Sequence, residues 1–146
     1  MITVLNYDDI YQVWKNHLWP DRKSEITKTS AMTFLGGYDV VNMSCTPTFL
    51  GYVESGVLLG VNSGHKCSDD SYRSRGLYVF PEARKKGIGT KLLIATIEQG
   101  KVESAKFVWS YPKQTSWHVY EKAGFSLSSP WETSELGFNA YCAKHL

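Results

Sequence analysis

A strand, a glycine-containing turn and a helix follow one another directly between Leu77 and Ile94, and this stretch limits the possible folds more than any other. Leu77-Tyr78-Val79-Phe80 is a short apolar run of strand-forming residues that ends at Pro81. After the turn, apolar residues recur at helical spacing, at Ile88, Leu92, Leu93 and Ile97. The pattern therefore predicts a strand, a turn and a helix in immediate succession.

The turn, Arg84-Lys85-Lys86-Gly87-Ile88-Gly89-Thr90, has the features of an anion site. The first N–H groups of a helix lack partners within the helix, and the helix dipole places partial positive charge there. Glycines at 87 and 89 allow a phosphate to approach the backbone, and the three basic side chains add mobile charge. The turn predicts a site for a di- or polyphosphate. The alternative is a solvated basic turn whose glycines only permit a tight bend.

Two common phosphate-binding loops do not fit this turn. A P-loop requires four residues between its first glycine and Gly-Lys-Ser/Thr, and Gly87-Ile88-Gly89-Thr90-Lys91 lacks that spacing and order. A dinucleotide-binding fingerprint requires a third glycine where Leu92 stands, followed about 20 residues later by an acidic residue. Lys106 and Phe107 occupy that later position. Neither nucleotide-binding motif is present.

Two motifs resemble one family. Arg84-Lys85-Lys86-Gly87-Ile88-Gly89 is similar to the Arg/Gln-x-x-Gly-x-Gly/Ala signature of the GNAT acetyltransferase superfamily. Tyr120-Glu121-Lys122-Ala123-Gly124-Phe125 resembles the end of the fourth helix in that family. The motifs occur in the family's order with a strand-forming segment between them. The resemblance extends along nearly the full length of the sequence.

The resemblance implies a mixed α/β (α+β) fold. The expected GNAT-like sheet has about six to seven strands, is flanked by about four helices, and splays between its fourth and fifth strands. Those two strands correspond here to Tyr72–Val79 and Ala105–Tyr111. At 146 residues, the chain suits one domain, and we expect residues 1–146 to form a single acyl-CoA N-acyltransferase domain.

Local patterns predict the remaining elements. We expect an opening strand at Ile2–Leu5 and a helix through Ile10 and Leu18. A second helix is expected at Ser24–Phe34, and a hairpin from Thr48–Val53 and Val57–Asn62. Further expectations are a bulge at Gly76, a helix from Gly87 to Gly100, a parallel strand at Phe107–Trp109, a helix at Gln114–Ala123, and strands at Phe125–Leu127 and Gly137–Cys142.

The resemblance also implies acetyl-CoA as the acyl-donor cosubstrate. Backbone groups of the fourth strand would pair with pantetheine, and the glycine turn would hold the pyrophosphate. The implied cofactor-binding residues are Leu77, Tyr78, Val79, Arg84, Lys85, Lys86, Gly87, Ile88, Gly89 and Thr90. Tyr120 is the implied catalytic residue, because its phenol can donate a proton to the departing thiolate. The alternative is that Tyr120 only packs between core and solvent.

The sequence departs from the family pattern at two positions. Lys113 stands where many relatives have an asparagine that binds pantetheine, and Arg73 stands where some have a glutamate base. His65 and His118 are candidate bases because histidine titrates near neutrality. Relay of the amine proton through water to the bulk solvent is the simpler hypothesis.

The net charge and the cysteine content limit which classes of partner the chain is expected to bind. A formal net charge of +2 is too small to indicate a nucleic-acid or membrane partner, and no apolar run reaches the length of a membrane span. Cys45, Cys67 and Cys142 are scattered and lack metal-ligand spacing, so no metal site is expected. We expect a cytoplasmic protein, and the sequence leaves its oligomeric state open, a dimer included.

The leading hypothesis is an N-acetyltransferase that transfers an acetyl group from acetyl-CoA to a primary amine within a ternary complex. The resemblance implies that the acceptor, a small molecule or a protein amine, is bound by segments 14–38 and 128–137, which correspond to the first two helices and the final strand pair of the family. Candidate acceptor-site residues are Trp19, Trp131, Asp21, Glu25, Glu132 and Glu135, which could equally form a solvated surface. One alternative is a non-catalytic acyl-CoA binding or sensing module. Another is a small nucleic-acid-binding protein, which the low net charge disfavours.

Overall fold

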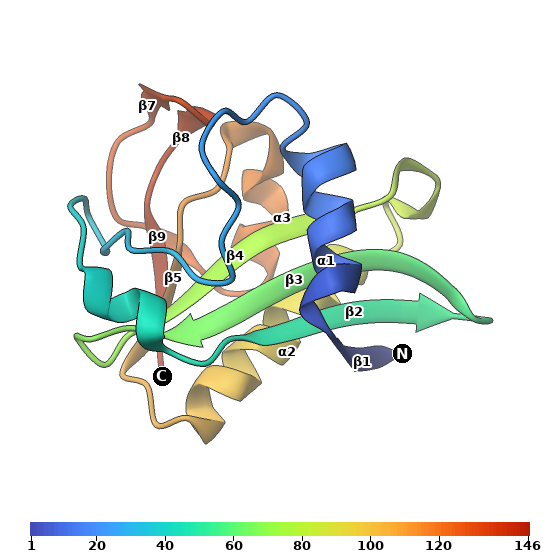
Figure 1. Cartoon of the computed structure of the whole chain (residues 1–146), viewed down its shortest axis with the longest axis horizontal. Coiled ribbons are helices and arrows are strands. Elements are labelled where there is room, and N and C mark those ends of the chain that lie inside the picture. The colour runs from blue at the N-terminus through green and yellow to red at the C-terminus, as the bar shows by residue number, and fades with distance from the viewer.

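The computed structural model describes all 146 residues and is built around a seven-stranded sheet (Figure 1). Across the sheet the strand order is β1-β2-β3-β4-β5-β9-β6. In chain order these strands are β1 (Ile2–Leu5), β2 (Thr48–Glu54), β3 (Val57–Lys66), β4 (Tyr72–Val79), β5 (Phe107–Ser110), β6 (Ser126–Leu127) and β9 (Cys142–His145). A separate hairpin consists of β7 (Glu132–Ser134) and β8 (Gly137–Asn139).

One strand pair, β4 and β5, is parallel, and every other pair is antiparallel. β4 and β5 pair only through Tyr72 with Val108 and Arg73 with Trp109. Beyond this point the strands separate, and the Ser110 hydroxyl donates a hydrogen bond to the Ser74 carbonyl at 2.8 Å. The predicted mixed sheet, with its splay between the fourth and fifth strands, is confirmed.

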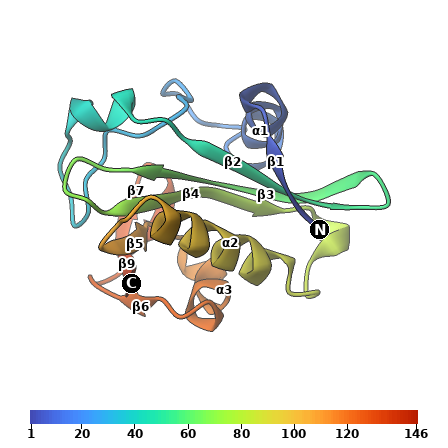
Figure 2. The same cartoon turned by 90° about the horizontal axis from the view of Figure 1, so that it is seen from below.

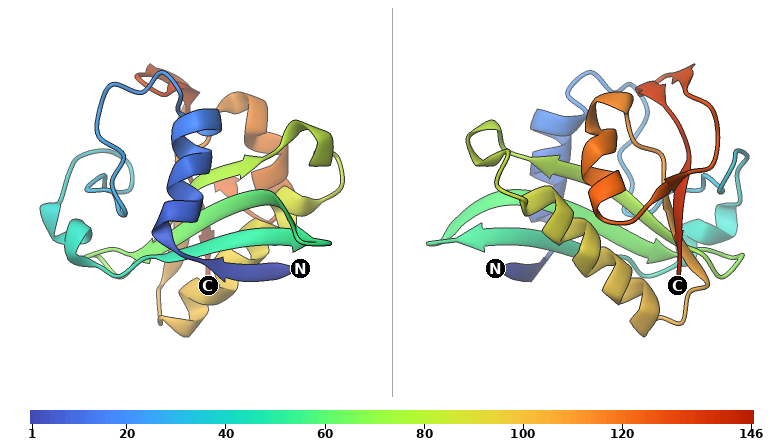
Figure 3. Two further views of the ribbon diagram at one scale, coloured as in Figure 1. Left: turned by 45° about the vertical axis from the view of Figure 1, so that its right-hand side comes forward. Right: turned by 180° about the vertical axis from the view of Figure 1, so that it is seen from behind.

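Helices cover both faces of the sheet (Figures 2 and 3). α1 (Tyr7–Val13), which continues as a π-helical turn over Trp14–Leu18, lies on one face together with the long segment that precedes β2. α2 (Ile88–Val102) and α3 (Trp117–Lys122) lie on the other face. Short 3-10 turns occupy Val40–Ser44, Pro81–Ala83 and Gln114–Ser116. The structure thus has three α-helices where the sequence predicted about four.

The two faces bury separate hydrophobic clusters. On the α1 face, Ile10, Val13 and Trp14 pack on Phe49 of β2 and Val61 of β3. On the other face, α2 and α3 bury a larger cluster against β4 and β5. Its eight members are Tyr72, Leu93, Ile97, Val108, Tyr120, Ala123, Phe125 and Cys142. The glycine turn lies between the end of β4 and the beginning of α2, and its Ile88 belongs to a third cluster with Leu50, Ala83 and Leu92.

The predicted helix at Ser24–Phe34 is wrong, because these residues form no regular element apart from an isolated bridge at Met32. Long-range polar contacts hold the segment extended across the sheet. The Thr27 carbonyl accepts a hydrogen bond from Arg75, and the Ser30 N–H donates to His65. Backbone groups used in this way are unavailable for helical pairing.

The end of α2 also differs from the prediction. Gly100 lies inside the helix, and the left-handed residue that follows the helix is Ser104, with φ 60°. A Cβ at Gly100 would lie 3.2 Å from Val108 and 3.3 Å from Tyr72. Gly100 therefore permits close packing of the helix on β4 and β5, and it does not serve as the helix terminus.

Other element predictions hold with shifted ends. The hairpin turn at Ser55-Gly56 has positive φ at both residues, but β3 continues to Lys66. The bulge at Gly76 is confirmed by the register shift between β3 and β4 and by a φ of 78°. The strand predicted at Gly137–Cys142 is divided, because Ala140 and Tyr141 separate β8 from β9.

Candidate functional site

The glycine turn presents an uninterrupted series of free backbone donors. The N–H of Arg84 donates to the Pro81 carbonyl, and the N–H of Lys91 donates to the Gly87 carbonyl. None of the six N–H groups between them, from Lys85 to Thr90, has a hydrogen-bond partner within the protein. Successive free N–H groups at a helix N-terminus form a concave anion-binding surface. The turn can therefore hold a phosphate group.

The two glycines of the turn have different roles. Gly87 has φ 77°, and a Cβ there would meet no atom within 4 Å, so its missing side chain leaves open space beside the free donors. Gly89 is buried, and a Cβ there would lie 3.0 Å from the Val119 side chain of α3. That both glycines admit a phosphate stays a prediction, and the geometry adds a packing role for Gly89. Gly89 allows α2 and α3 to pack closely.

Basic side chains surround the turn. Arg84, Lys85 and Lys86 are exposed. Arg84 bends back toward β4, where its Nε donates to the Val79 carbonyl at 2.9 Å and its guanidinium carbon lies 5.5 Å from the centre of the Tyr78 ring. These cations concentrate positive charge at the open end of the gap between β4 and β5.

The edge of β4 that faces the gap carries free backbone groups. The N–H of Phe80 donates to the Leu59 carbonyl of β3 at 3.0 Å. Because N–H groups alternate between the two edges of a strand, those of Val79 and Leu77 point away from β3 and toward the gap. Tyr78, by contrast, directs its N–H toward β3, and its ring contacts His17 and Phe80.

Tyr120 lies on the α3 side of the gap. It is 5% exposed and packs edge to face on Phe125, with ring centroids 5.6 Å apart. Burial raises the pKa of its phenol far above 10, while the nearby Ser110 side chain acts in the opposite direction. Because Ser110 marks the point where β4 and β5 separate, the Tyr120 hydroxyl lies at the closed end of the gap. A protonated phenol there can donate to a group inserted between the strands.

Neither histidine proposed as a base is well arranged for that role. His65 is 1% exposed; its Nε2 accepts from the Ser30 N–H, and its Nδ1 lies 3.1 Å from the Lys66 carbonyl oxygen. Burial, reinforced by Arg73 and Arg75, lowers the pKa of His65 to about 4. His118 is exposed on the surface of α3. His65 is thus a neutral structural side chain whose two ring nitrogens are already engaged.

A cavity of about 570 Å³ opens where the segment after α1 meets the β7–β8 hairpin. Lys113, which stands in place of the family's asparagine, lines it together with His17, Leu18, Trp19, Pro20, Asp21, Arg22, Lys23, Glu135 and Leu136. The ring of His17 stacks on Tyr78 of β4 at 5.7 Å, so the cavity adjoins the strand that borders the gap.

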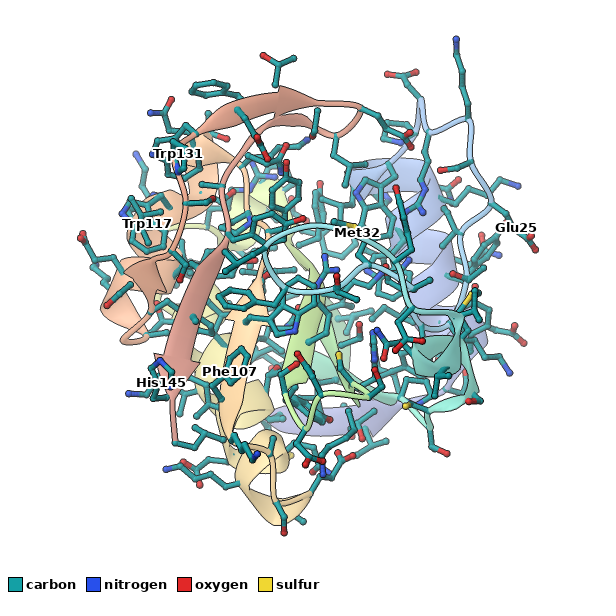
Figure 4. The ribbon with its side chains drawn as sticks, turned by 90° about the vertical axis from the view of Figure 1, so that its left-hand side faces the viewer. Glu25, Met32, Phe107, Trp117, Trp131 and His145 are labelled. Carbon is teal, nitrogen blue, oxygen red and sulfur yellow. The ribbon has the colours of Figure 1, made fainter.

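Three of the six candidate acceptor-site residues, Trp19, Asp21 and Glu135, line this cavity. The other three do not. Glu25 points outward, and Trp131 lies beside Trp117 at the far edge of the molecule (Figure 4). Glu132 accepts a hydrogen bond from Tyr111.

The family assignment rests on a sequence comparison. The family model described as "Acetyltransferase (GNAT) family" matches residues 8–125, which include the glycine turn, β4, β5 and Tyr120. The chain belongs to the GNAT acetyltransferase family. The comparison with curated protein sequences gave no match.

Solved structures agree with this GNAT assignment at the level of the fold. The chain is similar to the IAA acetyltransferase of Bacillus cereus, with 16% identity, a TM-score of 0.70, and coverage of 100% of this chain and 99% of that one. It is similar to a Bacillus subtilis acetyltransferase in complex with CoA, with 17% identity, a TM-score of 0.68, and coverage of 99% and 97%. It is also similar to the aminoglycoside 6'-N-acetyltransferase of Enterococcus faecium, with 13% identity, a TM-score of 0.68, and coverage of 99% and 96%.

The helices and the potential metal ligands of this GNAT domain do not meet what a membrane span and a metal site require. None of its helices combines the length and the apolar character that crossing a bilayer requires. No three or more His, Cys, Asp or Glu side chains gather in a way that could hold a metal ion.

Sequence reasoning missed several residues of the site. Ser110 at the closed end of the gap and His17 beside Tyr78 occur in no recognisable motif, and only the folded chain reveals their positions. Arg75 did leave a signal. Together with Arg73 it places two charges on one face of a predicted interior strand, where alternation predicts burial.

Proposed function

We propose that the protein is an N-acetyltransferase that uses acetyl-CoA and modifies a primary amine by direct transfer in a ternary complex. The observation that carries the proposal is the series of six unpartnered N–H groups, Lys85 to Thr90, at the open end of the gap between β4 and β5. A pyrophosphate bound there would leave its attached arm directed into a gap lined by free strand N–H groups.

Each residue has a distinct proposed role. The N–H groups from Lys85 to Thr90 bind the pyrophosphate, with added charge from Arg84, Lys85 and Lys86. The N–H groups of Leu77 and Val79 bind the pantetheine arm and polarise the thioester carbonyl. Tyr78 lies between these two residues on β4, and its ring stacks on His17. Acetyl-CoA, when bound, supplies the thioester that the acceptor amine attacks.

Tyr120 is the proposed proton donor. As the new C–N bond forms and the C–S bond breaks, the sulfur takes a proton from the Tyr120 phenol, which regains one from solvent. The amine loses its own proton to water, since His65 is engaged at both ring nitrogens and Arg73 replaces a carboxylate. The overall products are the N-acetylated amine and free CoA.

A non-catalytic acyl-CoA binding or sensing module is the second candidate. Arg73 and Lys113 favour it, because they stand where relatives have a base and a pantetheine ligand. It would retain the anion-binding turn and lack turnover.

The deciding experiment combines binding and turnover. Thermal melting with and without CoA or acetyl-CoA should show stabilisation of about 2.7 kcal/mol at a hundredfold excess over Kd. A melting curve unmoved by millimolar CoA contradicts both candidates. Release of free thiol from acetyl-CoA in the presence of a pool of amines supports the enzyme. Binding without thiol release supports the module.

The remaining parts of the proposal concern acceptor and location. The solved structures that this chain resembles include an aminoglycoside 6'-N-acetyltransferase and a ribosomal-protein-alanine N-acetyltransferase, so small molecules and proteins both enter the amine screen. We place the protein in the reducing cytoplasm. The three cysteines are free thiols, which supports this location.

A further inference from the structure

Two arginines are buried side by side on β4. Arg73 is 6% exposed and Arg75 is 4% exposed, and both side chains lie on the sheet face that α1 and the segment before β2 cover. They flank Ser74, whose carbonyl accepts the Ser110 hydroxyl where β4 and β5 separate. The Arg73 guanidinium, which also donates to the Ser74 carbonyl, therefore lies next to the closed end of the gap, and Arg75 is two residues further along β4.

Neither arginine has a counter-ion. The ion pairs of the protein are Lys66 with Asp70 and Lys101 with Glu98, both at the surface. Arg73 bonds weakly to Met32 Sδ and to the Ser74 carbonyl, and Arg75 donates only to the Thr27 carbonyl. Figure 4 shows Met32 over the middle of the sheet in the segment that covers these side chains. Burying a charge without an opposite charge is unfavourable, so two buried arginines that both lack a counter-ion require an explanation.

The free nitrogens of Arg75 are not sealed off. Arg75 uses Nη1 for its hydrogen bond, which leaves Nε and Nη2 without partners. Yet the one fully enclosed side-chain nitrogen or oxygen atom that lacks a partner is Asn62 Oδ1. The two free Arg75 nitrogens are therefore not completely enclosed, in agreement with the 4% exposure of the residue.

Trp19 lies between Arg75 and the cavity. The guanidinium carbons of Arg75 and Arg22 lie 5.3 and 4.7 Å from the centre of the Trp19 ring, and both Trp19 and Arg22 line the cavity. Lys23 and Lys113 add two more cations to its wall. Of its two acidic residues, Glu135 accepts from the Ser24 hydroxyl and forms no ion pair. The cavity and the residues behind it thus have an excess of positive charge.

The charge of the two arginines favours an anionic ligand. Burial lowers the pKa of Arg73 to about 10 and that of Arg75 to about 9. Arg73 acts further on Arg75 by like-charge repulsion. Both groups remain protonated at neutral pH, so a negatively charged ligand would find two positive charges with free donors.

We propose that the acceptor amine also carries a carboxylate, as a free amino acid does, and that Arg75, with Arg73 beside it, binds that carboxylate. This inference rests on the acetyl-transfer function proposed above. A guanidinium group presents parallel N–H donors that match the two oxygens of a carboxylate. Since both arginines flank Ser74, an amine on the same small molecule would lie beside the gap where the thioester is proposed to bind.

The test compares each acid with its amide. Wild-type protein is assayed by thiol release with free amino acids and with the matching amino-acid carboxamides, which keep the amine and lose the negative charge. We expect kcat/KM for the preferred acid to exceed that for its amide by about tenfold to hundredfold, the range of a charge-assisted hydrogen bond. The Arg75→Gln variant should lose most of this ratio, and Arg75→Lys should keep part of it. Lys15→Gln, an exposed change on the turn after α1, should keep it entirely.

Binding provides a second readout that does not need turnover or a stable variant. With CoA present, the preferred acid should raise the melting temperature of the wild-type protein, and its amide should not. Equal kcat/KM values for acid and amide overturn the inference, and so do equal shifts in melting temperature. A complete absence of response to the acids overturns it as well. The stabilisation by CoA alone is a separate measurement. A failure of the carboxylate preference is thus distinguishable from a failure of the acetyltransferase proposal.

Discussion

Tyr120 has a packing position in the core and a proposed role in the chemistry. Its ring belongs to the apolar cluster under α2 and α3, and its hydroxyl lies beside Ser110 at the closed end of the gap. We expect Tyr120→Phe to lower kcat by about 10²–10⁴-fold, because a positioned proton donor contributes that much. The ring remains, so the free energy of unfolding should fall by only about 1 kcal/mol, the net value of one hydrogen bond. Steady-state kinetics and chemical unfolding measure the two effects.

Tyr72→Phe is the matched control. Tyr72 is a buried phenol of the same cluster, but its hydroxyl donates to Glu103 at the end of α2. It should lose stability without a comparable loss of kcat. Because burial raises the pKa of Tyr120, its phenol stays protonated above pH 10, so loss of this proton should not reduce the wild-type rate between pH 7 and 9. Full activity of Tyr120→Phe would assign the proton to another group.

Gly89 and Lys85 differ in kind although both belong to the glycine turn. In Gly89→Val the new side chain would meet Val119 at 3.0 Å or less, so we expect a loss of about 1–3 kcal/mol in stability without CoA, and weaker CoA binding. Lys85→Ala removes an exposed charge and should weaken CoA binding less, by under about tenfold, with unchanged stability. Melting and titration calorimetry test this order. A stable Gly89→Val variant, or a larger CoA defect in Lys85→Ala, would contradict it.

Among the structural elements, β4 depends on its bulge. At Gly76 the strand adopts φ 78°, and a Cβ there would lie 2.4 Å from Trp14 Nε1, which donates to the Gly76 carbonyl. Gly76→Ala should therefore cost about 3 kcal/mol, from left-handed strain and displacement of the indole. Gly56→Ala, at φ 77° with no atom within 4 Å, should cost only the strain, about 1–2 kcal/mol. Equal losses in urea unfolding would mean that Trp14 moves freely.

The elements that sequence could predict are those whose patterns are local. The hairpin at Ser55-Gly56, the extent of β4 and the beginning of α2 each follow from a few adjacent residues. The failures lie where distant residues decide. Segment 24–34 shows weak helical spacing, but it is held extended by His65 and Arg75. Glycine is the residue type typical of a helix end, but at position 100 the close contacts with Val108 and Tyr72 require a glycine within the helix.

For the candidate site, the sequence identified the parts that carry motifs. The turn from Arg84 to Thr90 and the Tyr120 position stand in recognisable patterns, and their roles stay predictions. The counter-ion problem of Arg73 and Arg75 could not be seen, because a strand sequence does not reveal which acidic residues the fold will bring near. The different surroundings of Gly87 and Gly89, open space at the first and the Val119 side chain at the second, likewise depend on the position of α3.

At the scale of the whole molecule, acid stability should depend on His65. Its pKa is about 4 in the folded protein and near 6.5 in the unfolded chain, so between these values the unfolded chain binds the extra proton. Stability from this group is fully present above pH 6.5 and falls by about 3 kcal/mol as the pH drops to 4. His65→Gln should start less stable, because it loses packing, and its stability should fall less on acidification.

Unfolding curves at several pH values test this expectation. The wild-type and His65→Gln stabilities should converge as the pH falls from 6.5 to 4. His118→Gln, a change at an exposed position on α3, should run parallel to the wild type. Parallel curves for His65→Gln would show that a different group governs the acid response.

The separation of β4 from β5 gives one strand two unlike edges. Amide protons directed toward β3, such as those of Tyr78 and Phe80, are held in the sheet ladder, whereas those of Leu77 and Val79 have no partner strand. In deuterated water the first set exchanges only when the sheet opens, and the second exchanges with solvent that enters the gap. We therefore expect the end of β4, beyond its pairing with β5, to be protected from exchange at every second residue. We expect a ligand that fills the gap to remove this alternation.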